Sequence, residues 1–280
     1  MAVDKEKLQQ TLAAYEQARE LLEDGMTLRE ALALQLSPES LLSQASTGVD
    51  ISVSNGEWFE DLTRKLRNPS LVTTVTPHPA FRATLRPYQQ AGLNWLGFLD
   101  SLGFGACLAD DMGLGKTIQL LAFLHVKKPA ATTSLLVVPA SLIANWRSEL
   151  ERFAPALTYY IAHPGSMSAA QPLALSHEDL RQYDLVITTY AMVQRYELLQ
   201  TCRWDYVILD EAQAIKNPGT KQARVVKKLQ AGQRVILTGT PVENRLGDLW
   251  SLFDFLNPGL LGTPKEFKTF TKTLQNDPTG

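Results

Sequence analysis

The sequence predicts an α/β domain with a doubly wound parallel sheet, preceded by a small helical segment. From residue 81 onward, short apolar runs alternate with segments of helical periodicity. The runs are continuous instead of alternating between apolar and polar residues, which is typical of strands that a parallel sheet buries on both faces. The first 80 residues lack such runs and place apolar residues at helical spacing. We therefore expect a helical accessory segment and linker over residues 1–80 and the sheet domain over residues 81–280.

Several short helices are expected in the accessory segment. Apolar residues recur at helical spacing over residues 8–22, and Thr27 and Glu30 have the spacing of a capping box at the start of a second helix. A further amphipathic helix is predicted over residues 58–66. The helices around Thr27 are also compatible with a DNA-reading motif, but residues 1–80 are net acidic, which favours a helical packing module.

Five continuous apolar runs are the predicted strands of the sheet. They cover residues 106–109, 135–138, 185–187, 206–209 and 235–237. Helices are predicted over residues 88–99, 118–126, 142–153 and the basic stretch 221–228. Because right-handed crossovers leave the carboxyl ends of the strands at one edge, we expect a ligand site there.

The composition is that of an ordinary globular chain. Hydrophobic residues make up 45% and charged residues 20%, which excludes wholesale disorder. No apolar run approaches the ~20 residues that a membrane span needs. The charged start, residues 1–7, lacks the apolar core of a secretory signal. We therefore expect a cytoplasmic protein without membrane contact, associated with the nucleoid if the chain is bacterial.

The cysteines and histidines indicate neither a disulfide framework nor a metal centre. Two cysteines, Cys107 and Cys202, are too few for a framework, and no cysteine or histidine has metal-ligand spacing. We expect the four histidines in loops or on faces where their nitrogens are hydrogen bonded.

A glycine-rich stretch between a predicted strand and a predicted helix is the first candidate for a binding site. In Asp110-Asp-Met-Gly113-Leu-Gly115-Lys116-Thr117, the glycines permit a tight turn whose amides point at phosphate oxygens, and the following helix adds its positive N-terminus. Lys116 then reaches the β- and γ-phosphates, and the Thr117 hydroxyl can ligate magnesium. The strict pattern has glycine in place of Asp110. Taken alone, the stretch is also compatible with a glycine turn that caps a core helix.

Two adjacent carboxylates follow the apolar run 206–209. A buried strand that ends there delivers Asp210 to the edge of the sheet, where it can bind magnesium beside Lys116. Glu211 can then orient and deprotonate the attacking water. Paired acids also occur at solvated helix starts, but that alternative leaves the apolar strand before them unexplained. Together the two motifs predict an ATP site.

Six motifs follow one another along the chain in a fixed order. They are Leu85-Arg-Pro-Tyr-Gln89, Ala109-Asp-Asp-Met-Gly-Leu-Gly-Lys-Thr-Ile-Gln119, Val137-Val-Pro139, Asp210-Glu-Ala-Gln213, Leu237-Thr-Gly-Thr-Pro241 and Leu249-Trp-Ser-Leu-Phe-Asp-Phe-Leu-Asn-Pro258. The series resembles the first RecA-like lobe of the Swi/Snf family of DNA-translocating ATPases, in helicase superfamily two, over about residues 81–270. Residues 1–80 are more weakly similar to the helical segment before this lobe in bacterial and archaeal relatives. The resemblance implies a RecA-like P-loop NTPase fold, with ATP and magnesium as cofactors.

The resemblance also implies roles at the nucleotide site. The nucleotide would be bound by Gln89, Asp111, Met112, Gly113, Leu114, Gly115, Lys116 and Thr117. Gln89 would read the adenine edge, since an amide offers one donor and one acceptor; otherwise it is a polar residue on an exposed helix face. Gln213, with Lys116 and Glu211, would be catalytic, and it stands where many relatives have histidine.

Contacts with DNA are implied at the same edge of the sheet. The candidates are Ser141, Thr188, Thr189, Lys216 and Asn217, with a weaker one in the basic face of Lys221, Arg224 and Lys228. Thr238 and Thr240 would couple the nucleotide to the DNA groove, although a strand-end threonine is more often a simple cap. The net charge of −2 supplies no bulk attraction to DNA, so a local groove must bind it, through phosphates and without sequence preference.

We therefore expect the ATP-binding lobe of a translocase that moves on double-stranded DNA and remodels protein–DNA complexes. Its partners would be duplex DNA, a second RecA-like lobe that supplies arginines for hydrolysis, and a DNA-bound protein. Two other hypotheses remain, a strand-separating helicase of the same superfamily and a nucleotide-switched module for protein interaction. The motif 249–258 weighs against the first, and the general base Glu211 weighs against the second.

Overall fold

The computed structural model describes residues 57–128, 133–166, 176–240 and 246–276. The chain divides into two compact units, residues 1–67 and 68–280. In the first unit the structure describes helix α4 (Glu57–Arg67), which confirms the amphipathic helix predicted over residues 58–66. The helices predicted before residue 57 lie outside the described residues, and the boundary expected after residue 80 stays a prediction.

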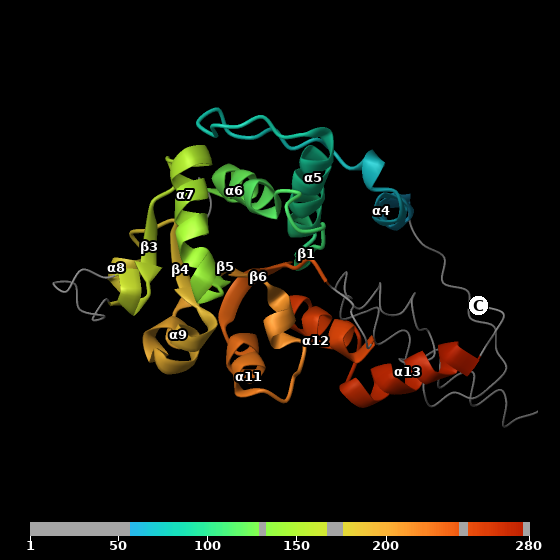
Figure 1. The fold of residues 1–280 in the computed structure, drawn as a ribbon. Helices are drawn as coiled ribbons and strands as arrows, with labels where there is room; N and C mark the ends of the chain where they lie inside the picture. The colour runs from blue at the N-terminus through green and yellow to red at the C-terminus, as the bar shows by residue number, and fades with distance from the viewer. Residues whose placement is uncertain (1–56, 129–132, 167–175, 241–245, 277–280) are drawn as a thin grey trace, which may run out of the picture. The chain divides into compact units, whose positions relative to one another are not determined.

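A six-stranded parallel sheet forms the centre of the second unit and confirms the predicted fold class (Figure 1). Its strands are β1 (Ala106–Leu108), β2 (Ser134–Val138), β3 (Tyr159–Ala162), β4 (Leu185–Thr189), β5 (Arg203–Leu209) and β6 (Gln230–Leu237). They lie in the order β1-β6-β5-β2-β4-β3. Leu237 of β6 pairs with Leu108 of β1, and Ile236 pairs with Leu209 of β5. The three strands therefore end at one edge, with β6 in the middle.

Strand β3 was missed by the sequence analysis. It lies at the edge of the sheet, where Tyr159, Tyr160 and Ile161 stay partly exposed. The inner strands β2 and β4 are instead buried at every residue. Strand β3 is covered less completely and begins with two tyrosines, so it lacks the aliphatic run typical of a fully buried strand, although β1 at the opposite edge was identified.

Helices cover both faces of the sheet (Figure 1). The first helical layer consists of α5 (Pro87–Ser101), α6 (Lys116–Lys127) and α7 (Ile143–Phe153), and the second consists of α9 (Tyr190–Arg195), α11 (Lys221–Lys227) and α12 (Leu246–Leu256). The other helices are α8 (His177–Leu180), α10 (Glu197–Thr201) and α13 (Pro264–Asn276), with short 3-10 helices η1 (Pro69–Leu71), η2 (Ala140–Leu142), η3 (Pro164–Ser166) and η4 (Ala212–Ile215). Each layer packs its own hydrophobic cluster against the sheet. None of the described helices is both long and apolar enough to cross a membrane.

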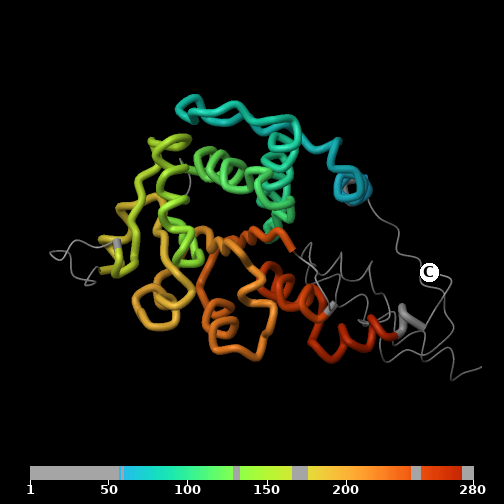
Figure 2. Tube along the Cα trace, viewed as in Figure 1, coloured from blue at the N-terminus to red at the C-terminus, as the bar shows by residue number. Residues whose placement is uncertain are grey.

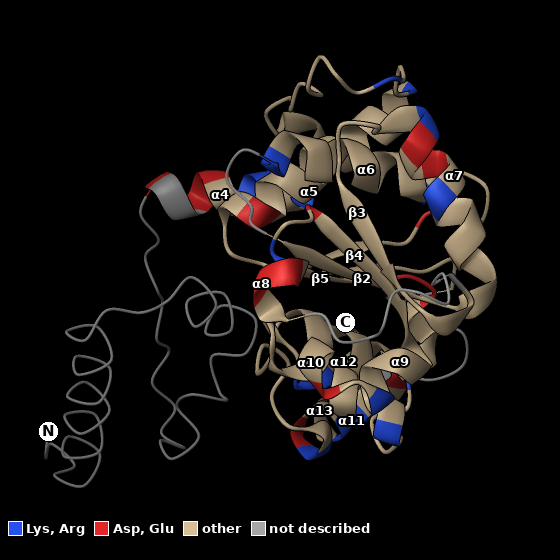
Figure 3. Cartoon of the chain, turned by 90° about the vertical axis from the view of Figure 1, so that its left-hand side faces the viewer, with Lys and Arg blue, Asp and Glu red and all other residues tan. Residues whose placement is uncertain are grey.

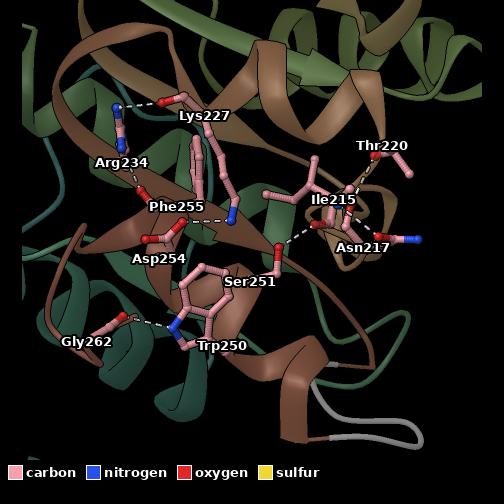
Figure 4. A network of polar contacts seen from close by, with 11 residues as sticks. Ile215, Asn217, Thr220, Lys227, Arg234, Trp250, Ser251, Asp254, Phe255 and Gly262 are labelled. Carbon is pink, nitrogen blue, oxygen red and sulfur yellow. Dashed lines mark hydrogen bonds and ion pairs between the residues drawn. The ribbon is translucent and has the colours of Figure 1, made fainter. Parts of the chain in front are cut away.

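Polar contacts fix α12 to its neighbours in the second layer (Figure 4). The buried Ser251 hydroxyl donates to the main-chain oxygen of Ile215 at 2.7 Å, and Asp254 pairs with Lys227 at 2.8 Å. Directly after α12, the buried Asn257 side chain accepts from the amide of Gly105 at 2.9 Å. Because Gly105 immediately precedes β1, the motif 249–258 fixes the strand that leads into the glycine-rich loop.

An extended segment, residues 72–86, runs over the outer side of α6 before α5 begins (Figure 2). Its Phe81 is buried in the first-layer cluster, and the amide of Arg82 donates to the main-chain oxygen of Phe153 at 2.7 Å. The segment thus packs on the first helical layer.

His125 shows that one expectation about the histidines was wrong. It lies inside α6 with 2% of its surface exposed, and neither ring nitrogen has a hydrogen-bond partner among the described residues. Its ring packs against His78, with centroids 4.8 Å apart, and against Phe81 at 6.4 Å. Burial lowers the pKa of His125, as do the charges of His78 and Lys128, while the charge of Asp184 opposes them. Protonation of this ring is therefore less favourable in the folded chain than in the unfolded one.

We expect the free energy of unfolding to decrease as the pH falls below about 6.5. His125 has a lower pKa in the folded chain than in the unfolded one, so the unfolded chain takes up the proton first. The loss starts at the unfolded-state pKa and ends below the folded-state pKa. Urea denaturation of the wild type and His125→Leu, from about pH 8 to about pH 5, measures it. At the higher pH, the difference in free energy of unfolding between the wild type and His125→Leu reports packing alone. If this difference stays constant towards the lower pH, the prediction is wrong.

Candidate nucleotide-binding site

The glycine-rich loop connects the end of β1 to the start of α6. Gly113 and Gly115 have φ angles of +83° and +82°, in the left-handed region that favours glycine. Gly115 is also the N-cap of α6, and a Cβ atom there would lie 2.6 Å from the side-chain nitrogen of Gln89. The loop thus needs its glycines for backbone conformation and for close packing. It presents the N-terminus of a 12-residue helix, which is a favourable place for an anion.

Lys116 folds back into this loop. Its Nζ donates to the main-chain oxygens of Asp110 at 2.7 Å and Asp111 at 3.2 Å. Thr117 follows in the first turn of α6 and is half-buried. The ammonium group therefore lies at the loop itself, and its contact with phosphates stays a prediction.

Gln119 is a residue of α6 that contacts the loop and that the sequence analysis did not assign. It is fully buried in α6, and its Nε2 donates to the Asp110 carboxylate at 2.8 Å and to the Gly115 main-chain oxygen at 3.2 Å. This contact gives Asp110, which replaces the first glycine of the strict pattern, a fixed place. The signal available in the sequence was a polar amide within an otherwise apolar helical stretch, because such an amide needs a hydrogen-bond partner when it is buried.

Gln89 connects the loop to α5. Its Oε1 accepts from the amide of Arg86 at 2.9 Å, and its Nε2 donates to the main-chain oxygen of Leu114 at 3.1 Å. It is buried, so it is not a residue of an exposed helix face. Its predicted contact with adenine stays a prediction.

Asp210 lies directly after β5 and is 8% exposed. Its Oδ2 accepts from the indole nitrogen of Trp146 at 2.8 Å, and its Oδ1 accepts from the amide of Glu211 at 2.9 Å. Burial raises the pKa of the Asp210 carboxyl, whereas these two hydrogen bonds and the charge of Lys116 act in the opposite direction. Strand β6 lies between β1 and β5, and the three strands end together, so the glycine-rich loop and the acids follow strands at the same edge of the sheet.

A chain of hydrogen bonds runs from Glu211 to the end of β6. Glu211 has a φ of +50° and is the one described non-glycine residue with a positive φ, a conformation that is concentrated at functional sites. Its Oε2 accepts from Gln213 at 2.5 Å, and the Thr238 hydroxyl donates to the other side-chain atom, Oε1, of Gln213 at 3.2 Å. The Thr238 hydroxyl also accepts from the amide of Thr240 at 3.2 Å. The motif after β6 therefore contacts the acid motif directly.

The candidate DNA residues differ in exposure. Ser141 is exposed in η2, and the N-cap of α7 is Leu142, so Ser141 lies one residue further from the helix than expected. Thr188 is fully buried and donates to the main-chain oxygen of Ala162, and Thr189 caps α9. Both threonine hydroxyls thus have protein partners, and their DNA contacts stay predictions.

Lys216 and Asn217 lie at the border of a hollow of about 850 Å³, together with Asp248, Trp250, Phe267 and Lys268. Asn217 is exposed, and its Oδ1 accepts from the amide of Gly219 at 2.9 Å, which closes a turn. The neighbouring helix α11 exposes the basic side chains of Lys221 and Arg224 (Figure 3). These residues give this side of the second layer its positive charge.

The donor set fits magnesium. Thr117 and Asp210 would supply the oxygen ligands that a hard cation prefers, and each Asp210 oxygen carries one protein donor and so keeps lone-pair capacity. No group of three or more histidine, cysteine or acidic residues in the described part could hold a metal. Magnesium at phosphates commonly takes only one or two protein oxygens and leaves the other positions to phosphate and water.

Comparisons with known proteins place the chain in a family. The model of a family described as SNF2-related domain matches residues 88–278. The chain is 40% identical over 269 residues to the Bacillus subtilis ATP-dependent helicase/translocase YwqA, and the match covers 91% of this chain and 28% of YwqA. It is 36% identical over 233 residues to the TATA-binding protein-associated factor MOT1 of Saccharomyces cerevisiae, covering 77% of this chain and 12% of MOT1.

A solved structure shows the same fold. It is the Sulfolobus solfataricus SWI2/SNF2 ATPase core in complex with dsDNA, which is 43% identical, with a TM-score of 0.65. The match covers 73% of this chain and 42% of the Sulfolobus chain. This chain therefore spans less than half the length of each of the three relatives. From the family match and the RecA-like sheet, we conclude that the chain belongs to the SNF2-related family and corresponds to a lobe of the Swi2/Snf2 ATPase core.

Proposed function

We propose that this lobe binds ATP with magnesium and, together with a second RecA-like lobe, hydrolyses it to move along double-stranded DNA and displace bound proteins. The observation that supports this most directly is the placement of Lys116 and Asp210. Lys116 follows β1 and Asp210 follows β5, and these two strands flank β6 and end with it at the same edge of the sheet. Phosphates that lie between them meet a helix N-terminus, a cation and a metal-binding acid together.

Each side chain has a distinct role in this proposal. Lys116 binds the β- and γ-phosphates, while Thr117 and Asp210 hold magnesium, which neutralises the charge that develops on the phosphates. Glu211 orients the attacking water and accepts its proton. Gln213 relays the position of Glu211 to Thr238, with which it shares a hydrogen bond.

The DNA interface is proposed at the edge where the sheet strands end. Ser141, Lys216 and Asn217 contact phosphates, and the basic face of α11 extends the surface. The Sulfolobus relative was solved with dsDNA, which supports a duplex as the partner. Contacts confined to phosphates give binding without sequence preference, which a motor that steps along any sequence requires.

Replacement of Lys116 with alanine is expected to weaken ATP binding about 10- to 100-fold, because it removes charge-assisted hydrogen bonds to the phosphates. Calorimetric titration of the chain with ATP and MgCl₂ measures the change. Lys127→Ala is the matched control, since Lys127 ends the same helix and pairs with Asp100. If Lys116→Ala bound ATP as tightly as Lys127→Ala, the proposed nucleotide site would be wrong.

A further inference from the structure

The carboxylate of Asp210 is held from the first helical layer by Trp146. This tryptophan lies in α7, is 1% exposed, and belongs to the first-layer cluster together with Ile143 and Leu150. Its indole nitrogen is 2.8 Å from Oδ2 of Asp210. An indole has one donor and no rotatable hydrogen, so a packed ring fixes the direction of this bond. The bond therefore limits rotation of the carboxylate.

The main chain of the same residue is held from the second helical layer. The hydroxyl of Tyr190, the first residue of α9, donates to the main-chain oxygen of Asp210 at 2.7 Å. Tyr190 is buried in the second-layer cluster. Asp210 is thus bound through its side chain by one layer and through its main-chain oxygen by the other, while its amide donates to the main-chain oxygen of Val137 in β2.

We propose that Trp146 and Tyr190 are positioning residues that hold Asp210 in place for the metal ion of a bound nucleotide. This inference rests on the proposed function, in which Asp210 binds magnesium. Both donors bond to Asp210 itself and leave lone pairs of each carboxylate oxygen for the metal. Outer partners of this kind fix the geometry of a ligand, and their loss commonly lowers metal affinity about 10- to 100-fold.

The test measures how much magnesium strengthens nucleotide binding by the chain. A non-hydrolysable ATP analogue is titrated calorimetrically in MgCl₂ and again in EDTA. Magnesium strengthens binding of the analogue by a certain factor in the wild type, and in Trp146→Phe we expect this factor to be about 10-fold smaller. Tyr190→Phe is expected to lose about threefold, the effect of one ordinary hydrogen bond. Binding in EDTA should stay within about twofold of the wild type in both variants, because the phosphate contacts of Lys116 are unchanged.

Trp204→Phe is the matched control. Trp204 is also fully buried, and its indole nitrogen donates to the main-chain oxygen of Leu199 at 3.1 Å, so its replacement costs a comparable bond without touching Asp210. This variant should keep the full gain from magnesium. Thermal denaturation of each variant checks that it is folded. If Trp146→Phe does not fold, the inference is tested with Tyr190→Phe.

Three outcomes overturn the inference in distinguishable ways. If Trp146→Phe keeps the full gain, or loses affinity equally in EDTA, then the tryptophan is only structural while the proposed function stands. If Tyr190→Phe behaves as the wild type, its bond to the backbone of Asp210 does not position the carboxylate. If the wild type itself gains nothing from magnesium, Asp210 is not a metal ligand, and the proposed function fails as well.

Discussion

Joining this chain to a second RecA-like lobe is expected to raise its rate of ATP hydrolysis about 10³- to 10⁵-fold. An arginine that reaches the phosphates in the transition state is worth that much in phosphoryl transfer. In the described part of this chain, the groups that contact the glycine-rich loop and the acids supply one cation, Lys116, and the resemblance assigns the arginines to the other lobe. Hydrolysis by the chain alone should therefore be slow, even with magnesium and duplex DNA present.

Steady-state phosphate release measures this difference. The chain alone is compared with the same chain in one polypeptide with a second lobe, each with and without duplex DNA. The control is the two-lobed protein with its candidate arginines replaced by alanine, which should fall back towards the rate of the chain alone. Fast, DNA-stimulated turnover by the chain alone would show that this lobe holds the complete catalytic machinery.

Replacement of Glu211 with glutamine in the two-lobed protein should lower hydrolysis about 10²- to 10⁴-fold, the usual contribution of a general base. The amide has nearly the same shape, but it cannot accept the proton of the attacking water. Binding of ATP should persist, because Lys116, Thr117 and Asp210 are unchanged. The variant should therefore accumulate with ATP bound, and movement along duplex DNA should stop.

Single-turnover hydrolysis and ATP retention on a filter test this together, with displacement of a triplex strand as the measure of movement. Glu178→Gln, on the exposed start of α8, is the matched control. If Glu211→Gln still hydrolysed ATP within about threefold of the wild type, Glu211 would not be the base. If hydrolysis stopped but function with a protein partner survived, the nucleotide-switched module would be favoured over the motor.

The sequence predicted most strands because burial on both faces leaves a continuous apolar run. The run 206–209 identified β5 in this way, and Asp210 followed from it. The partly exposed strand β3, which begins with two tyrosines, was missed, whereas β1 at the opposite edge was identified. The histidine interpretation failed at His125 because its burial depends on the packing of residues 72–86 against α6, and no local pattern indicates where that segment packs.

The site residues show the same division between local and distant information. Residue spacing within one loop was enough to indicate Lys116 and Thr117, because a strand, a turn and a helix are contiguous there. The partners of Asp210 were not foreseen, since Trp146 lies 64 residues away in sequence. Burial of Thr188 also depends on its neighbour strand, whose Ala162 accepts its hydroxyl. Such pairings are properties of the tertiary structure.

The contacts of Lys116 with two carbonyl oxygens of its own loop have a consequence for the release of ADP. In the proposed function, incoming ATP would displace these contacts, so its net affinity would be lower than the phosphate contacts alone would give. After hydrolysis the same carbonyls would compete with ADP for the ammonium group. This competition would favour release of the product over its tight retention.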